Sequence, residues 1–202
     1  MGEIAYGRCG EISTSEGQTD PLTTDKLGAQ IVLSKAGKYK SAALAGRLFS
    51  VANQAAVATT AALATTWTGL GVCNPAGSGK NLIIHEFGFS LSLAAAKAGS
   101  VGLMISDDTG FTDSLTKRAG MYGSGSSVAY CSAGCTIATP VLERIIGDYG
   151  TAATSAKALT GPFIYEVDGS IILPPDRSVL TYTTLDTTAA FIFHFMWEEV
   201  PV

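Results

Sequence analysis

Apolar and polar residues alternate most regularly near the C-terminus, over residues 189–200. Alternation with a period of two is typical of a β-strand that buries one face. Four aromatic side chains share one face of this strand: Phe191, Phe193, Phe195 and Trp197. The opposite face carries Ile192, His194, Met196 and Glu198. We therefore expect the aromatic side chains to fill a core between two sheets.

Other segments show the same period or are bounded like strands. In residues 81–93 the apolar-rich odd positions, which predict one buried face, are Ile83, His85, Phe87, Phe89, Leu91 and Leu93. Residues 99–106 repeat the pattern with Val101, Leu103 and Ile105. The remaining strand candidates are residues 69–73, 136–146, 163–167, 170–173 and 178–184.

Turn residues separate these segments. Asp168-Gly169 is a strong hairpin signal within residues 163–173. The short segment 186–188 predicts an antiparallel hairpin between residues 178–184 and 189–200. Short strands at intervals of roughly 8–12 residues predict an all-β fold, an antiparallel β-sandwich or jelly roll.

Some parts of the chain lack a clear period. Residues 52–66 combine helix-favouring Ala with β-branched Thr, and we expect extended or irregular structure there. Residues 121–135 are rich in Gly and Ser, which predicts a long loop between short strands, and residues 150–159 are small and polar, which predicts a loop. Residues 1–40 contain few large apolar residues, so we expect an extended N-terminal arm that is ordered by a partner, followed by a β-sandwich or jelly-roll domain over residues 41–202.

Charge is scarce in this sequence. Charged residues make up 15 % of the 202 residues, against roughly 25 % in an average soluble protein. A surface made largely of Thr, Ser, Gly and Ala is easier to desolvate against another protein. The net charge is −4, and the Lys and Arg residues form no run, which argues against binding to nucleic acid.

No segment is suited to a membrane. The most apolar C-terminal stretch, residues 189–197, is far shorter than the roughly 20 residues that a membrane helix needs. Residues 1–6 lack the basic and apolar regions of a secretory signal, so we expect the protein to be made and used in a cytoplasm.

The segment Gly77-Ser78-Gly79-Lys80 resembles part of a phosphate-binding loop. The full motif needs a Gly where Asn74 stands and a Ser or Thr where Asn81 stands, and it must lead into a helix. A strand follows instead, which favours a hairpin turn.

Metal ligands and catalytic groups are few. His85 and His194 are the only histidines, and a metal site needs several converging ligands, so we expect each His to be half-buried and hydrogen-bonded. Asp107, Asp108 and Asp113 could offer oxygens to calcium, but they lack the EF-hand spacing and fit a solvated turn better.

Nothing in the sequence predicts an enzyme. It contains no G-x-S-x-G elbow. Glu198 and Glu199 are neighbours on a strand and point to opposite faces, so they cannot act together as acid and base. We therefore predict no catalytic, cofactor-binding or metal-binding residues and no cofactor.

The four cysteines are Cys9, Cys73, Cys131 and Cys135. Their spacing fits neither a zinc knuckle nor a redox pair. Buried thiols are the main expectation, and a Cys131–Cys135 bridge across a tight loop is the alternative.

Four segments resemble virion structural proteins of tailed bacteriophages: RLFSVANQ at 47–54, TTWTGL at 65–70, NPAGSGKNL at 74–82, and the ending from AFIF at 190–193 to WEEVP at 197–201. The resemblance covers residues 38–202 and rests on strand and turn segments. It implies a jelly-roll module that forms trimers and sits on the capsid as cement, or at its vertices as a fibre base. The family supplies no catalytic residues.

We accordingly expect a phage capsid decoration or cement protein that oligomerises, as a trimer, and stabilises the head shell. Its partners would be other copies of itself and the major capsid protein, without direct contact to nucleic acid or membrane, in a virion assembled in the host cytoplasm. The alternatives are a tail or head-fibre component, a carbohydrate-binding jelly-roll module with Trp67 near a loop, and a cupin-type enzyme, which the shortage of His disfavours.

Overall fold

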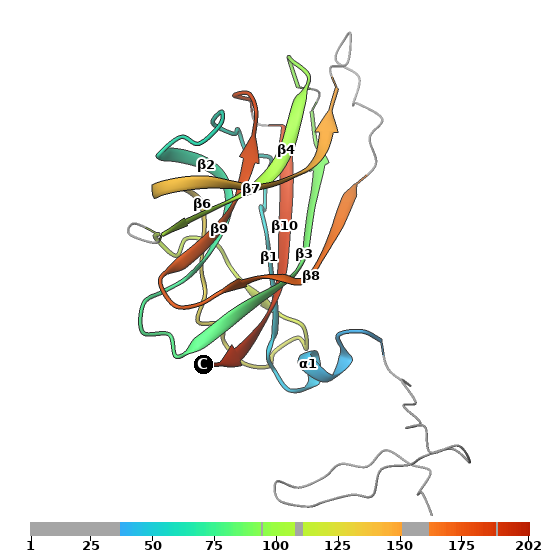
Figure 1. The fold of residues 1–202 in the computed structure, drawn as a ribbon. Helices are drawn as coiled ribbons and strands as arrows, with labels where there is room; N and C mark the ends of the chain where they lie inside the picture. Colours follow the sequence, from blue (N-terminus) through green and yellow to red (C-terminus); the bar gives the residue numbers. More distant parts are fainter. Residues whose placement is uncertain (1–36, 94, 108–110, 151–161, 189) are drawn as a thin grey trace, which may run out of the picture. The chain divides into compact units, whose positions relative to one another are not determined.

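The computed structural model describes residues 37–202, except residues 94, 108–110, 151–161 and 189. The predicted arm, residues 1–40, therefore lies outside the described residues except for its last four. The short helix α1 spans Lys40–Leu44. The strands are β1 (Leu48–Ala52), β2 (Thr66–Asn74), β3 (Lys80–Leu91), β4 (Gly99–Asp107), β5 (Arg118–Ala119), β6 (Tyr130–Thr136), β7 (Ala138–Tyr149), β8 (Phe163–Leu173), β9 (Arg177–Thr183) and β10 (Phe191–Pro201) (Figure 1).

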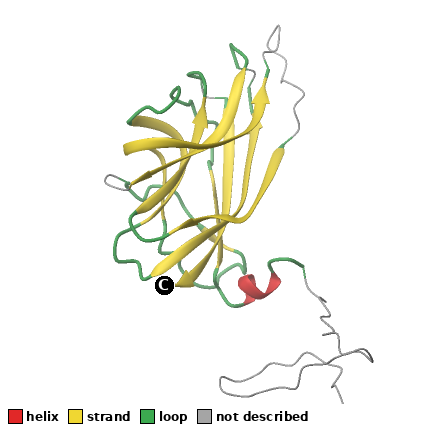
Figure 2. Cartoon of the chain, in the orientation of Figure 1, coloured by secondary structure: helices red, strands yellow, loops and turns green. Residues whose placement is uncertain are grey.

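The strands form two five-stranded antiparallel sheets that pack as a sandwich (Figures 1 and 2). The first sheet has the order β5-β1-β10-β3-β8, and the second has the order β6-β2-β9-β4-β7. This architecture confirms the predicted all-β sandwich.

The pairing between strands is nested along the chain. β1 pairs with β10, β2 with β9, β3 with β8 and β4 with β7, and every pair is antiparallel. Nested pairing of this kind is what results when one long antiparallel ribbon is folded over on itself into two sheets, which is the jelly roll.

The segment between β4 and β7 adds one strand to each sheet. β5 pairs with β1, and β6 pairs with β2. The Asp113 carboxylate joins the two additions, because it accepts a hydrogen bond from the Cys131 amide of β6 and contacts the Lys117 ammonium next to β5. We call the edge formed by residues 111–137 the insertion side. The opposite edge, where β7 and β8 end the two sheets, is the open side.

The core lies between the sheets and is rich in aromatic rings. Phe191, Phe193, Phe195 and Trp197 of β10 are fully buried, as predicted from their alternation. The Phe191 and Phe193 rings stack with their centroids 5.1 Å apart, and Phe195 lies 5.0 Å from Phe87 of β3. Because β10 runs between β1 and β3, its rings occupy the centre of the sandwich.

β3 changes its buried face at His85. Leu82 and Ile84 are buried before this point, whereas Phe87 and the next odd positions are buried after it. Ile84 pairs with Ile171 of β8 and Glu86 pairs with Glu166, so the register shifts around His85. A bulge of this kind moves the following side chains to the other face.

The prediction that all the odd positions of this segment share one buried face was therefore wrong. Ile83 and His85 are half-buried on the other face from Phe87, and Leu93 lies beyond the end of β3 and is exposed. A period of two predicts a face only as far as the pleat is regular.

The Asp168-Gly169 pair does not form the predicted hairpin. β8 is one continuous strand, and its residues on both sides of the pair bond to β3. Asp168 and Gly169 have φ values of 51° and 75°, and the Ser170 hydroxyl donates to the Val167 carbonyl at 2.7 Å. The two residues therefore shape a wide bulge opposite His85 rather than a reversal of the chain.

Residues 178–184 and 189–200 do not pair as the predicted hairpin either. β9 pairs with β2 and β4 in the second sheet, whereas β10 pairs with β1 and β3 in the first. The prediction of a hairpin turn at Gly77–Lys80 was also wrong, because this turn leads from β2 in the second sheet to β3 in the first, although a strand does follow it. Connections that cross between sheets are what the nested topology requires.

Residues 53–65 contain no helix or strand, as expected, and touch the sheets through isolated bridges of Val57 to Phe191 and Ala61 to Thr183.

Beyond the main core, a second apolar cluster contains Trp67, Cys73, Met104, Phe111, Ile137 and Leu180. Phe111 belongs to the insertion side and approaches Gly71 so closely that a Cβ there would lie 2.6 Å from its ring. The insertion thus covers part of the second sheet.

Candidate functional site

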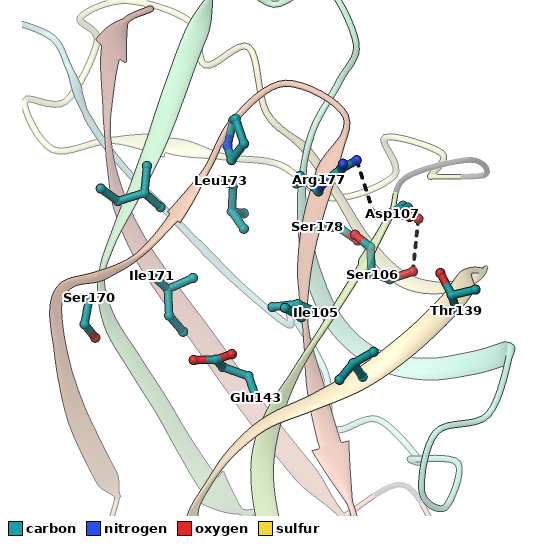
Figure 3. A pocket seen from close by; sticks show the side chains of 13 residues that line it. Ile105, Ser106, Asp107, Thr139, Glu143, Ser170, Ile171, Leu173, Arg177 and Ser178 are labelled. Atoms are coloured by element: carbon teal, nitrogen blue, oxygen red, sulfur yellow. Dashed lines mark hydrogen bonds and ion pairs between the residues drawn. The ribbon is translucent and has the colours of Figure 1, made fainter.

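A cleft of about 480 Å³ opens on the open side, where the edges of the two sheets part (Figure 3). β7, the end of β4 and the start of β9, all in the second sheet, supply one wall, and β8 of the first sheet supplies the other. The apolar part of the lining comes from Ile105, Val141, Ile171, Ile172 and Leu173. A cleft lined in this way can bury an apolar side chain of a ligand or partner.

Polar groups stand at the two ends of the cleft. The Arg177 guanidinium pairs with the Asp107 carboxylate at 3.2 Å, and both side chains are about half exposed. At the other end Arg144 of β7 bonds the Glu143 carboxylate at 2.8 Å and the Ser170 hydroxyl of β8 at 3.1 Å. The Arg144 side chain therefore connects the two edge strands.

β7 and β8 also expose large apolar side chains, two of which, Val141 and Ile172, line the cleft. Six large side chains of these strands are between 39 % and 57 % exposed: Val141, Leu142, Ile145, Phe163, Ile164 and Ile172. Within the described part of the chain, each of these two strands pairs with another strand on one side only. Long edge strands with exposed apolar side chains are a feature that soluble monomers usually avoid.

The two predicted histidine positions lie on the outward face of the first sheet. His194 Nε2 is 2.7 Å from Glu86 Oε1, and its ring lies over Gly88, where a Cβ would overlap it. His85 Nε2 is 3.4 Å from Glu198 Oε2, and its ring is 4.8 Å from that of Tyr39. Both side chains are half-buried and hydrogen-bonded, as predicted.

Each histidine thus pairs with one carboxylate. Among the residues that the structure describes, no three His, Cys, Asp or Glu side chains are grouped closely enough to hold a metal ion.

The aspartates considered as calcium ligands serve different contacts. Asp107 belongs to the cleft through Arg177, whereas Asp113 holds the insertion through Lys117 and the Cys131 amide. Asp108 lies outside the described residues.

Glu198 and Glu199 point to opposite faces of β10, as predicted. Glu198 lies on the outward face, where it pairs with Arg47 at 3.1 Å. Glu199 is buried, and its carboxylate accepts hydrogen bonds from the Ser127 hydroxyl at 2.6 Å and the Val128 amide at 3.0 Å. It also pairs with the Lys80 ammonium at 2.8 Å.

The buried Glu199 carboxylate therefore holds the insertion against β10. The sequence carries no signal for it, because a Glu next to an aromatic stripe is usually exposed.

Cys73, Cys131 and Cys135 are not in disulfides, so the alternative of a Cys131–Cys135 bridge is wrong. Cys73 and Cys131 are buried, as expected, and Cys135 is half-buried. Burial raises the pKa of the Cys131 thiol far above its ordinary value of 9.0. Cys9 lies outside the described residues.

Trp67, the aromatic residue considered for carbohydrate binding, is buried in the second apolar cluster, where its indole nitrogen donates to the Thr181 carbonyl at 2.8 Å. Trp197 is buried in the main core. Neither tryptophan therefore presents a face on which a sugar ring could stack.

Comparison of the chain with known protein families, with curated proteins and with solved structures finds no match. Among the described residues, no helix is both long and apolar enough to cross a membrane.

Proposed function

We propose that this protein is a structural component of a bacteriophage particle, a capsid decoration or cement protein that self-associates and stabilises the head shell. The observation that carries the proposal is a jelly roll whose open side exposes large apolar side chains. Nested strand pairing of this kind is used by viral capsid domains, as well as by lectins and cupins. The exposed apolar edge suits a protein that works inside an assembly.

Composition and resemblance support the same proposal. A surface with few charges loses little solvation when another protein covers it, and only 15 % of the residues are charged. The segments that resemble tailed-phage virion proteins fall on β1, on β2 and β3 with the turn between them, and on β10. β10 pairs with both β1 and β3, and β2 directly precedes β3 in the chain.

The physical role is mechanical. Packaged DNA strains a capsid shell, and a protein that bridges neighbouring capsomers adds buried surface where the shell contacts are weakest. Each additional 1,000 Å² of buried apolar area contributes roughly 25 kcal/mol before entropic costs are subtracted.

The alternative within the same class is a tail or head-fibre component. The two differ in copy number, because a decoration protein covers the whole shell whereas a fibre component occupies one or a few positions. Quantitative mass spectrometry of purified particles, referenced to the major capsid protein, separates them.

The direct test is binding of the purified protein to mature capsids that lack it, followed by heating. We expect saturable binding and a higher temperature of capsid disruption, with bovine serum albumin as the control. Failure to bind capsids at micromolar concentration would reject the decoration function.

A further inference from the structure

We propose that copies of this protein associate head to tail, with the open side of one copy seated against the insertion side of the next. The proposal deepens the function proposed above and rests on the self-association that it includes. A contact between two different surfaces of the same chain is heterologous, and it closes into a ring when the rotation between copies allows.

Strand order places the two surfaces at opposite ends of both sheets. β7 and β8 end the sheets on the open side, and β5 and β6 end them on the insertion side. One copy can therefore offer both surfaces at the same time, each to a different neighbour.

Charge distinguishes the two surfaces. β7 and β8 carry four carboxylates (Glu143, Asp148, Glu166 and Asp168) against one guanidinium (Arg144), a formal charge of −3. Residues 111–137 carry Lys117 and Arg118 against Asp113, a formal charge of +1. Contact of two open sides would bring like charges together, whereas contact of unlike sides brings complementary charges together.

The exposed apolar area on the open side matches a standard interface. Large side chains expose on the order of 200 Å² each when free, so the six half-exposed side chains on β7 and β8 present roughly 500 Å² of apolar surface. A standard interface takes about 800 Å² from each partner, of which roughly 60 % is apolar. Summed over both faces of the two strands, the exposed apolar area is therefore on the scale that one such contact buries.

The contact is expected to rest on side chains rather than on strand addition. The pairing of β7 with β4 shifts register at three places, and β8 has the bulge at Asp168-Gly169. Such irregularities interrupt the regular row of backbone groups that an added strand needs. The 480 Å³ cleft between the two edges can instead receive a side chain of the neighbouring copy.

The insertion side offers a suitable side chain in Tyr122, which is 89 % exposed. Tyr122 lies in a turn that is held by Ser124, whose amide and hydroxyl both donate to the Met121 carbonyl, at 3.0 and 2.7 Å. A tyrosine on an ordered turn loses little conformational freedom on binding, and tyrosines are frequent among the side chains that dominate interfaces. We assign Tyr122 as the anchor of the contact.

Two variants that each disable one surface test the proposal. Ile172→Glu changes the open side, and Tyr122→Glu changes the insertion side; Leu93→Glu changes an exposed apolar residue outside both surfaces. We expect either of the first two to weaken the contact at least ~30-fold and to yield monomers in sedimentation equilibrium, whereas the Leu93 variant keeps the wild-type mass. Circular dichroism checks that each variant is folded, and Ile164→Glu replaces Ile172→Glu if that variant unfolds.

Mixing the two monomeric variants gives the distinctive result. Each retains the surface that the other lacks, so an equimolar mixture should form a dimer. The mixture is measured at about 100 µM protein, because a single contact lacks the avidity of a closed ring. A Tyr122→Glu variant that keeps the wild-type mass, or a mixture that stays monomeric, overturns the head-to-tail contact.

The outcomes also separate this inference from the proposed function. An oligomeric wild type with unaffected variants rejects only the assigned surfaces. A monomeric wild type rejects self-association, and with it both this inference and that part of the proposed function. An intact head-to-tail oligomer that does not bind capsids rejects the decoration function and leaves the contact between copies standing.

Discussion

At the scale of single residues, the stability of this protein depends most on the aromatic stripe of β10. Phe193 is fully buried and lies between Phe191 and Phe87, with ring centroids 5.1 and 6.0 Å away. Its neighbour Ile192 is partly exposed on the outward face of the same strand. The two positions form a matched pair, because they share a strand and differ in face.

Phe193→Ala should lower the free energy of unfolding by roughly 3–5 kcal/mol, because the cavity between the sheets cannot collapse fully. Ile192→Ala, the control, should cost less than about 1 kcal/mol, because the side chain keeps contact with water in the folded state. Denaturant titration measures both. A loss below about 1 kcal/mol for Phe193→Ala would show that this face does not carry the core.

Cys131 should make stability depend on pH in the alkaline range. Burial holds its pKa far above 9.0 in the folded state, so between pH 9 and 10 the unfolded chain releases this proton and the folded protein keeps it. The unfolding free energy should therefore be unaffected by this thiol below pH 9 and fall above it, by up to about 1.4 kcal/mol per pH unit.

In the Cys131→Ala variant, the unfolding free energy should depend less steeply on pH. The difference between the wild-type and variant slopes is due to Cys131 alone, because Cys73 contributes equally to both. Measurements stop at pH 10, because burial also raises the pKa of Tyr149 above its ordinary value of 10.0. Above pH 10 this hydroxyl would therefore lower the unfolding free energy in the same way as the thiol. Equal slopes for wild type and variant would contradict the assignment.

At the scale of elements, one buried carboxylate holds part of the insertion against β10. Glu199 of β10 accepts hydrogen bonds from Ser127 and Val128 and pairs with Lys80. Glu199→Gln removes the negative charge and replaces one acceptor oxygen by an NH2 group, which would face another hydrogen-bond donor. This should lower the free energy of unfolding by about 1–3 kcal/mol. Glu198→Gln, on the adjacent outward position, should cost less than about 1 kcal/mol.

Limited proteolysis adds a local measurement to this prediction. We expect faster cleavage within residues 120–130 in the Glu199 variant than in the Glu198 variant, because only Glu199 bonds to that segment. Equal cleavage rates would show that the insertion is held by other contacts.

The N-terminal segment is the other element with a testable role. The compact unit Tyr39–Val202 contains both sheets and the whole aromatic core, so it should fold without the preceding residues. Deleting residues 1–33 should leave a folded, soluble oligomer that no longer binds capsids. Loss of the folded state in this deletion, seen by circular dichroism, would reject the idea that these residues serve only as a docking arm.

At the scale of the whole molecule, we expect a stable homotrimer at micromolar concentration. The apolar area of the open side supplies the affinity, whereas the unlike charges of the two sides orient the copies and speed their encounter. Moderate salt should therefore slow association and leave the final mass nearly unchanged. Addition of a chelator should have no effect on the mass.

Sedimentation equilibrium with and without chelator checks this prediction. A mass of 20.8 kDa across the concentration range would reject the oligomer. Dissociation on adding chelator would indicate a metal site, and His85, His194 and Asp107 are the positions to substitute first.

Alternation alone was sufficient to predict which face of β10 is buried, because the pleat places every second side chain on the same side wherever the strand is regular. It was also sufficient for the all-β class and for the opposite orientations of Glu198 and Glu199. The same rule failed in β3, since the pairing of β3 with both of its neighbours, β8 and β10, skips His85, and the bulge there changes the buried face.

The partner of each strand could not be predicted locally. Asp168-Gly169 has the residues of a tight hairpin, but positive φ values serve a bulge equally well, and the bonds of β8 to β3 decide between them. Residues 178–184 and 189–200 are close in sequence, yet each completes a different sheet, because folding the long ribbon over sends successive strands to opposite layers.

The open side likewise exists only in three dimensions. Val141 and Ile172 lie in strands that read as ordinary sandwich strands in the sequence, and they line one cleft because the topology makes β7 and β8 the last strands of their sheets on the same side. The sequence by itself determined the buried face of a regular strand such as β10 and the polar, weakly charged composition of the chain. The tertiary structure decided which strand edges remain exposed, because strand pairing depends on contacts between residues that are far apart in the chain.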